Sequence, residues 1–319
     1  MTDLLTLDNG LLSVVIDAGR GAEILSLTHR DSGIDVLFAT PWRDVADAIR
    51  AGTRAPSTTD PTAAWLERYR GGWQTLIPNA GPPRSVCGAP VGFHGEASSV
   101  PWEVCRSAPM STELRTTLFS VPIEIERLVS LDTDRAAVST CDVLHNLSDV
   151  EVEIDYVNHP AFAGPLLDGR CSVDTGARVF TADPDTDGNI AAGGTSHAWP
   201  WIERAEGTTV DLRVVPPPGE RHMAFGWLSD FDGHYAAITN HDLGLTVRME
   251  WDGTHLPYAW WWQEINHMKG FPWYRRARVI AIEPSSTVTS GPSRRSVLRV
   301  PGGSSVRLPM TVSIEGRAR

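Results

Sequence analysis

Two histidines lie where acid and base chemistry could use them. The segment "GFHGEASSVPW" (residues 92–102) sets His94 between small residues, with Glu96 two positions further on. The segment "EVEIDYVNHPAFAGP" places His159 directly before Pro160, and a residue before proline favours extended geometry. We therefore expect the His159 side chain to be held off one face of a strand. It would serve there either as a chemical group or as a cap for backbone groups.

A carboxylate occupies a similar position late in the chain. In "RVIAIEPSS" (residues 278–286) the period-two alternation puts Glu283 on the strand face of Val279 and Ala281, directly before a proline. Burial among such side chains would raise the pKa of Glu283 from about 4.3 and make it a stronger base at neutral pH. A salt bridge to one of the nearby arginines, Arg275, Arg276 or Arg278, is the structural alternative.

Aromatic and amide side chains flank these groups in two further segments. "YAWWWQEI" (residues 258–265) contains consecutive tryptophans around Trp261, followed by Gln263, and a strand must turn two of the three indoles the same way. "YRGGWQTLIPNAG" (residues 69–81) offers a second group. Such combinations suit the C–H faces and hydroxyl rim of a sugar, although core packing explains any single tryptophan equally well. The candidate binding residues are Trp73, Gln74, Asn79, Glu96, Trp261 and Gln263.

The elements that must position these residues are mostly short strands. Runs of alternating polar and apolar residues recur along the chain, with turns at Asn9-Gly10, at residues 19–21 and at residues 31–33. Helical periodicity is confined to residues 42–50 and 61–69, the second beginning after Asp60. We predict an all-β fold with one or two short helices, formed by residues 1–319 as a single domain.

Composition and charge exclude several classes of protein. A formal net charge of −11 gives no basic surface for nucleic acid or anionic membranes, so a small-molecule partner is expected. The four cysteines form no CxxC pair, which predicts reduced thiols and neither a zinc site nor a disulfide framework. The acidic segment "DPDTDGNI" (residues 183–190) lacks the twelfth-position glutamate of a calcium loop and predicts an ordinary turn. The N-terminal segment lacks the features of a signal peptide, so we expect a cytoplasmic protein.

Taken in order, these segments resemble the aldose 1-epimerase (galactose mutarotase-like) family. The resemblance rests on the N-terminal meander, "GGWQTLIPNAG", "HGEASSVPW", the histidine of "VNHPAF" and the late "IEP". It implies a large β-sandwich of twisted antiparallel sheets, with a sugar site in a cleft on one concave face. It also implies an isomerase of carbohydrate metabolism that interconverts the α and β anomers of an aldopyranose or modified sugar, without a cofactor and without a metal.

The resemblance assigns a role to each titratable residue. Glu283 would take the proton from the anomeric hydroxyl, His159 would give one to the ring oxygen, and His94 would hydrogen-bond near that oxygen. The ring then opens, the aldehyde rotates about C1–C2, and closure on the other face reverses the roles. The family's sugar-binding aspartate has three candidates in this sequence, Asp230, Asp232 and Asp252.

Two other classes of function compete with the enzyme. The first is a carbohydrate-binding or sugar-sensing protein that keeps the fold without turnover. The second is a cupin-like metal enzyme built on His94 and Glu96, although the paired HxH of cupins is missing from the sequence. The presence of His94, His159 and Glu283 together favours the enzyme, because a binding protein needs no matched acid and base. The sequence leaves the identity of the sugar and the oligomeric state open.

Overall fold

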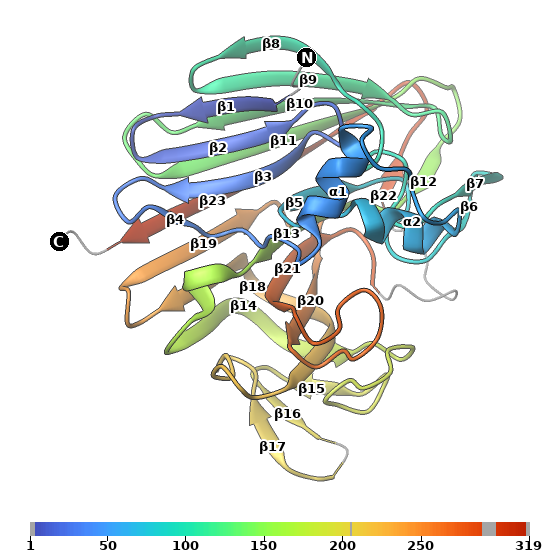
Figure 1. Ribbon diagram of the computed structural model, residues 1–319. Helices are drawn as coiled ribbons and strands as arrows, with labels where there is room; N and C mark the ends of the chain where they lie inside the picture. The colour runs from blue at the N-terminus through green and yellow to red at the C-terminus, as the bar shows by residue number, and fades with distance from the viewer. Residues whose placement is uncertain (1–3, 205, 289–297, 317–319) are drawn as a thin grey trace.

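The protein is described by a computed structural model that covers residues 4–204, 206–288 and 298–316. Seventeen strands form one continuous antiparallel sheet system that folds into two layers (Figure 1). Its strands are β1 (Leu4–Asp8), β2 (Leu12–Asp17), β3 (Glu23–His29), β4 (Ile34–Asp35), β5 (Trp73–Leu76), β8 (Glu103–Ala108), β9 (Ser111–Thr117), β10 (Ile123–Leu131), β11 (Ala137–Asn146), β13 (Val157–Phe162), β14 (Cys171–Ala182), β15 (Ser196–Ala198), β18 (His222–Asn240), β19 (Leu245–Trp251), β20 (Tyr258–Ile265), β21 (Arg278–Ser285) and β23 (Ser305–Gly316).

The remaining elements are short. Three two-stranded ribbons pair β6 (Arg84–Val86) with β7 (Ala89–Val91), β12 (Val152–Ile154) with β22 (Leu298–Val300), and β16 (Trp201–Glu203) with β17 (Thr209–Asp211). The helices are α1 (Arg43–Arg50), α2 (Pro61–Arg68) and the 3-10 turn η1 (Gly164–Leu167). The prediction of an all-β sandwich with one or two short helices is therefore confirmed.

The strand pairings define the two layers. One layer runs β8-β9-β10-β11-β23-β19, and the other runs β1-β2-β3-β5-β13-β21-β20. The long strand β18 joins them, because its first half pairs with β20 and its second half with β19. The main apolar core lies between the layers and takes side chains from both, including Val14, Ile125, Val312 and Ile282. Burial of these side chains is the main force that holds the layers together.

Local sequence signals explain the turns and helix starts that position the second layer. Gly10, Gly21 and Gly33 all have positive φ at the predicted turns, where a side chain would be strained. Helix α2 begins after Asp60, whose Oδ1 accepts a hydrogen bond from the Ala63 backbone N–H at 2.8 Å. Both helices lie together on one side of the sheets, beside β5 and β13 (Figure 1). They cover the outer face of the second layer, where the candidate site is found.

The cysteines and the acidic segment 183–190 have the structures expected from the sequence. All four cysteines are free, as predicted. Residues 183–190 form a turn in which Asp183 accepts hydrogen bonds from the Asp185 N–H and the Thr186 hydroxyl. Within the described ranges, no helix combines the length and apolar character that crossing a bilayer requires.

Candidate functional site

A cavity of about 340 Å³ lies on the outer face of β13, β20 and β21. This volume is at the lower end of the range of about 300–1,000 Å³ that is typical of small-molecule sites. Helix α2 and the loop after β7 close the cavity. Its lining is mainly aromatic and apolar, and comprises Trp65, Leu66, Tyr69, Gly81, Pro82, Phe93, His94, His159, Thr186, Met223, Phe225, Trp260, Trp262, Met268, Trp273 and Glu283.

Strand register brings the predicted acid and base together. Strand β13 pairs with β21 so that Val157 is opposite Ser285 and Ala161 is opposite Ala281. The same register sets His159 opposite Glu283, and directly opposed residues share a face. Strand β20 continues this row, because Trp260 pairs with Glu283. Residues separated by more than a hundred positions in the chain therefore form one line across the sheet.

His159 and Glu283 are in direct contact and almost fully buried. The His159 Nε2 atom lies 3.5 Å from Glu283 Oε1. The His159 Nδ1 and Glu283 Oε2 atoms are both buried without a hydrogen-bond partner among the described residues. Buried polar atoms without partners are rare, and these two lie in residues that line a cavity. They are therefore available to a polar ligand.

Burial disfavours the charged form of each group. Desolvation raises the pKa of Glu283 well above its ordinary value and lowers the pKa of His159 to about 4. Burial therefore favours the neutral carboxyl and the neutral imidazole at this contact, although its length is within ion-pair range. The proposed salt bridge from Glu283 to an arginine is not formed: Arg278, for example, donates to the carbonyl oxygens of Leu167 and Pro216.

A tight turn after β7 presents His94 to the same cavity. His94 has a φ of 58°, and its backbone N–H donates to Gly81 O. Its Nδ1 accepts a hydrogen bond from the Gly81 N–H at 2.9 Å. A neutral His94 must therefore carry its proton on Nε2, so that this nitrogen is the donor. The His94 and His159 rings are 5.7 Å apart between centroids, so the structure brings together all three predicted catalytic side chains.

Two predicted sugar contacts on β20 must be corrected. Trp261 is fully buried in the core between the layers, and Gln263, two residues further on, is on that same strand face. The alternation of β20 instead turns Trp260 and Trp262 into the cavity. The prediction that two of the three indoles face the same way is correct, but the central indole is not one of them.

Trp73 and Gln74, which were predicted to contact the sugar, have structural roles instead. Trp73 packs in the core between the layers and donates its indole N–H to Asn158 Oδ1. Gln74 lies opposite His159 in the cross-strand row, but its amide donates to Glu23 Oε2 and Gly71 O. Neither side chain lines the cavity, and both support the strand that carries His159.

Asn79 and Glu96 likewise hold loops in place. The Asn79 amide donates to Gly92 O at 2.9 Å and to Pro82 O at 3.1 Å, which ties the loop before His94 to the loop after β5. The Glu96 carboxylate accepts hydrogen bonds from the Phe119 and Ser120 backbone N–H groups, away from the cavity. Neither of these two predicted sugar contacts lines this cavity. None of the three candidate aspartates, Asp230, Asp232 and Asp252, lines the cavity either.

Sequence reasoning missed several cavity residues. Tyr69 has a buried hydroxyl without a partner in the described chain, and burial raises its pKa well above its ordinary value. Trp65 donates its indole N–H to Ser98 Oγ and packs edge-on against His94, 4.5 Å between ring centroids. Thr186 enters from the acidic turn. Tyr69 is the first residue of the aromatic segment 69–81, and its place there could have marked it as a site residue. No local sequence pattern marks Trp65 or Thr186 as a cavity residue.

The cupin-like alternative is not supported by the geometry. Glu96 does not share the cavity with His94, because it is engaged by the loop at residues 119–120. Among the residues that the structure describes, no group of three or more histidine, cysteine, aspartate or glutamate side chains could hold a metal ion.

This fold is the galactose mutarotase-like sandwich. The Slr1438 protein of Synechocystis sp. PCC 6803 is similar with a TM-score of 0.69 at 16% identity, covering 99% of this chain and 98% of that one. A galactose mutarotase-like protein of Lactobacillus casei is similar with a TM-score of 0.66 at 17% identity, covering 98% of this chain and 100% of that one. A galactose mutarotase related enzyme of Lactobacillus acidophilus gives a TM-score of 0.65 at 13% identity, with coverage of 98% and 97%. At these identities the likeness establishes the fold.

At the level of sequence, the chain belongs to the family described as "Domain of unknown function (DUF4432)", whose model matches residues 2–302. No curated protein matches it in sequence.

Proposed function

We propose that the protein is an aldose 1-epimerase, which interconverts the α and β anomers of a sugar by opening and closing its ring. The observation that carries the proposal is the contact of His159 with Glu283 at 3.5 Å in an aromatic cavity that His94 also lines. Anomer exchange needs one group to accept a proton and another to donate one within the same site. Aromatic faces at Trp260 and Trp262 suit the C–H faces of a pyranose ring.

The neutral forms of the pair define the direction of the first proton transfers. His159 accepts the proton of the anomeric hydroxyl while the Glu283 carboxyl donates its proton to the ring oxygen, and the C1–ring oxygen bond breaks. The aldehyde then rotates about C1–C2. In closure, the Glu283 carboxylate takes back the proton from the ring hydroxyl and the His159 imidazolium returns one to the carbonyl oxygen. Glu283 is thus the acid in opening and the base in closure, whereas the sequence resemblance implies the opposite order.

The lining also suggests the kind of sugar. Among the described residues that line the cavity, few side chains are polar: besides the acid–base pair, His94 and the indole N–H groups of the tryptophans, they are Tyr69 and Thr186. A sugar hydroxyl that leaves water without finding a partner costs about 1–3 kcal/mol. We therefore infer a sugar with fewer free hydroxyls than an ordinary hexose, such as a deoxy or O-methylated aldose with a free anomeric centre.

NMR exchange spectroscopy, which measures the rate of exchange between the α and β anomers, tests this function on a panel of freshly dissolved sugars. The panel pairs each fully hydroxylated aldose with a deoxy and an O-methylated derivative. We expect the protein to accelerate anomer exchange, most strongly for the derivatives. A protein that binds these sugars without accelerating exchange in any of them would instead be a sugar-binding protein.

The pH dependence of the rate follows from the same pair. The pKa of His159 is lowered to about 4, so the imidazole is a neutral base above that pH. As the pH falls below about 4, the imidazole becomes protonated and can no longer act as the base. Burial raises the pKa of Glu283 well above the ordinary carboxyl range, so its carboxyl loses the proton at a higher pH than an exposed glutamate does. After the spontaneous rate is subtracted, kcat/KM should be bell-shaped, with its acid limb near pH 4. An acid limb at the ordinary histidine pKa of about 6.5 would contradict this assignment.

A further inference from the structure

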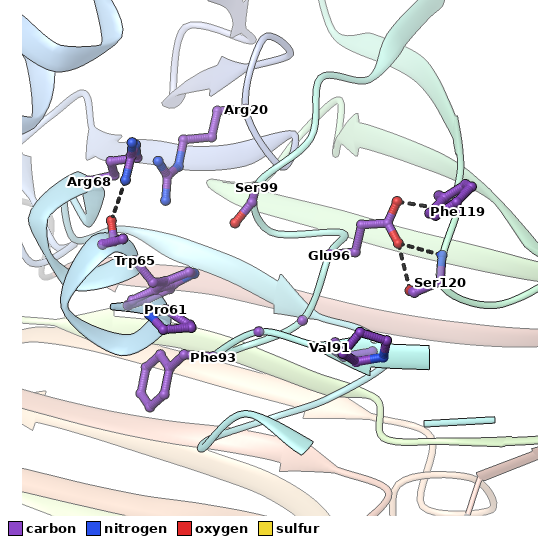
Figure 2. A pocket seen from close by; sticks show the side chains of 14 residues that line it. Arg20, Pro61, Trp65, Arg68, Val91, Phe93, Glu96, Ser99, Phe119 and Ser120 are labelled. Atoms are coloured by element: carbon purple, nitrogen blue, oxygen red, sulfur yellow. Dashed lines mark hydrogen bonds between the residues drawn. The ribbon is translucent and has the colours of Figure 1, made fainter. Parts of the chain in front are cut away.

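A second cavity, of about 460 Å³, lies beside helix α2 (Figure 2). Helix α2 contributes one face to it, through Pro61, Ala64, Trp65 and Arg68, which are spaced by three or four residues. The opposite wall includes Val91, Phe93 and Ser99, and the turn between β2 and β3 adds Arg20. The cavity therefore has an apolar floor and two guanidinium groups at one end.

Arg20 is an unusual residue for this position, because it is only 8% exposed. Its Nε is buried and has no hydrogen-bond partner in the described chain. Figure 2 shows its guanidinium group pointing toward the side of the cavity that holds Arg68 and Ser99. The turn that carries it is fixed, since the Gly21 N–H donates to Val100 O at 2.7 Å.

The acidic groups nearest to Arg20 are occupied by other cations. Asp17 accepts hydrogen bonds from Arg50 Nε at 3.0 Å and Nη2 at 2.8 Å, and it also pairs with Arg70. Glu23 accepts from Arg70 Nε at 3.0 Å and from Gln74 Nε2 at 2.9 Å. A smaller adjoining cavity of about 170 Å³ is lined by Arg20, Arg50, Arg68 and Arg70, so positive charge is concentrated here.

Arg20 is a buried cation, and no carboxylate of the described chain forms a hydrogen bond with it. Burial lowers the pKa of Arg20, and the neighbouring Arg70 and Arg68 add to this effect, whereas the charges of Glu23 and Asp17 oppose it. An arginine nevertheless stays protonated at neutral pH. Leaving such a charge buried and unpaired is strongly unfavourable, whereas an oxyanion that accepts two parallel N–H bonds compensates it.

We propose that this cavity binds a small oxyanion, a phosphate or carboxylate group, between the guanidinium groups of Arg20 and Arg68. The planar fork of arginine matches both groups in bidentate fashion, and the Ser99 side chain lies on the same side of the cavity (Figure 2). The Glu96 carboxylate on the far side does not obstruct this end, because its oxygens accept from Phe119 N at 2.8 Å and from Ser120 N at 2.9 Å.

The oxyanion site is separate from the catalytic cavity but shares a wall with it. Trp65 and Phe93 line both cavities. Phe93 also packs against His94, with 3.9 Å between their ring centroids. An apolar group attached to the oxyanion would rest on these two aromatic side chains. The site does not depend on catalysis, so its test is a binding measurement.

Calorimetric titration with inorganic phosphate, and separately with acetate, tests the site at constant ionic strength set with sodium chloride. We expect wild-type protein to bind at least one of the two probes, and a preference between them distinguishes a phosphate from a carboxylate ligand. The Arg20→Met variant should bind at least about thirtyfold more weakly, since it loses a buried charge pair. Arg68→Gln should also weaken binding. Arg20→Lys, which keeps the charge but loses the planar fork, should also bind the probes more weakly than wild type.

Two control variants should leave phosphate and acetate binding unchanged. Arg106→Gln removes an exposed arginine that is paired with Glu113, and Glu283→Gln alters the catalytic cavity only. Without either probe, Arg20→Met should melt no lower than wild type, because it removes an uncompensated charge and keeps an aliphatic stem. Failure of both probes to bind wild type, equal weakening by Arg106→Gln, or marked destabilisation by Arg20→Met would overturn the proposal.

Discussion

Replacement of Glu283 by glutamine should lower the rate of anomer exchange by at least about 100-fold on any sugar that the wild-type protein accelerates. Glutamine keeps the shape of the side chain but can neither donate the carboxyl proton to the ring oxygen nor take it back. General acid–base groups contribute about 10²–10⁴ in rate, which sets the lower limit. The rate is measured by NMR exchange spectroscopy at saturating sugar, after the spontaneous rate has been subtracted.

His159→Asn should cause a loss of similar size, and the double variant should lose little more than either single variant. The two groups contact each other and act in one transfer, so that the second substitution removes little that the first has left. Simple addition of the two losses in free energy would show that the residues act independently. That result would contradict the mechanism.

The chain offers a matched control for each substitution. Glu264 on β20 is also fully buried with a raised pKa, but it accepts from the His267 and Met268 N–H groups and lies outside the cavity lining. His222 on β18 is buried and, like His159, has a pKa lowered to about 4 by burial. We expect Glu264→Gln and His222→Asn to retain wild-type exchange rates. If they lose activity as severely as the paired variants, general damage to the sheet is the better explanation.

These controls also show why altered pKa values alone do not identify the site. Burial shifts the pKa of His222 as strongly as that of His159, yet only His159 lines the cavity and faces a carboxyl group. The distinction comes from register across β13 and β21, which depends on long-range pairing. A sequence shows which residues alternate within one strand, but it does not show which residue of another strand lies opposite.

The strand pattern was sufficient for much of the fold. Alternation gave the two faces of β21 correctly, since Ile280 and Ile282 enter the core between the layers while Val279 and Ala281 pack on the outer side with Glu283. In β20 the same rule left two equivalent choices, because tryptophans occupy both faces. Only the pairing of Trp260 with Glu283 shows which face belongs to the cavity.

Residues outside strands were harder to predict from sequence. Asn79, Gln74 and Glu96 are polar residues close in sequence to the site, and each forms hydrogen bonds with backbone or carboxylate groups. That role is common for buried polar side chains, and sequence alone does not separate it from ligand binding. Trp65 reaches the cavity because α2 folds across the outer face of the second layer, a tertiary arrangement without a local signature.

The turn that carries His94 depends on a glycine at position 95. Gly95 has a φ of +76°, and a Cβ built there would lie 2.2 Å from the Ile77 carbonyl oxygen and 2.8 Å from Asn79 O. Both contacts are with backbone atoms, which cannot move aside as a flexible side chain could. Gly95→Ala should therefore lower the free energy of unfolding by about 2–5 kcal/mol, through left-handed strain and overpacking together.

The same substitution should reduce catalysis more than its effect on stability explains. The displaced turn carries His94, whose Nδ1 depends on the Gly81 N–H for its position. Gly33→Ala is the matched control: Gly33 has a φ of +69°, but a Cβ there meets nothing within 4 Å. Urea unfolding gives the stability of both variants, and exchange rates are measured where both remain folded. We expect Gly95→Ala to lose at least about tenfold in kcat/KM, since misplacing a catalytic side chain by about 1 Å can cost about 100-fold. Equal stability losses in the two variants, with wild-type rates in both, would show that close packing at Gly95 does not position His94.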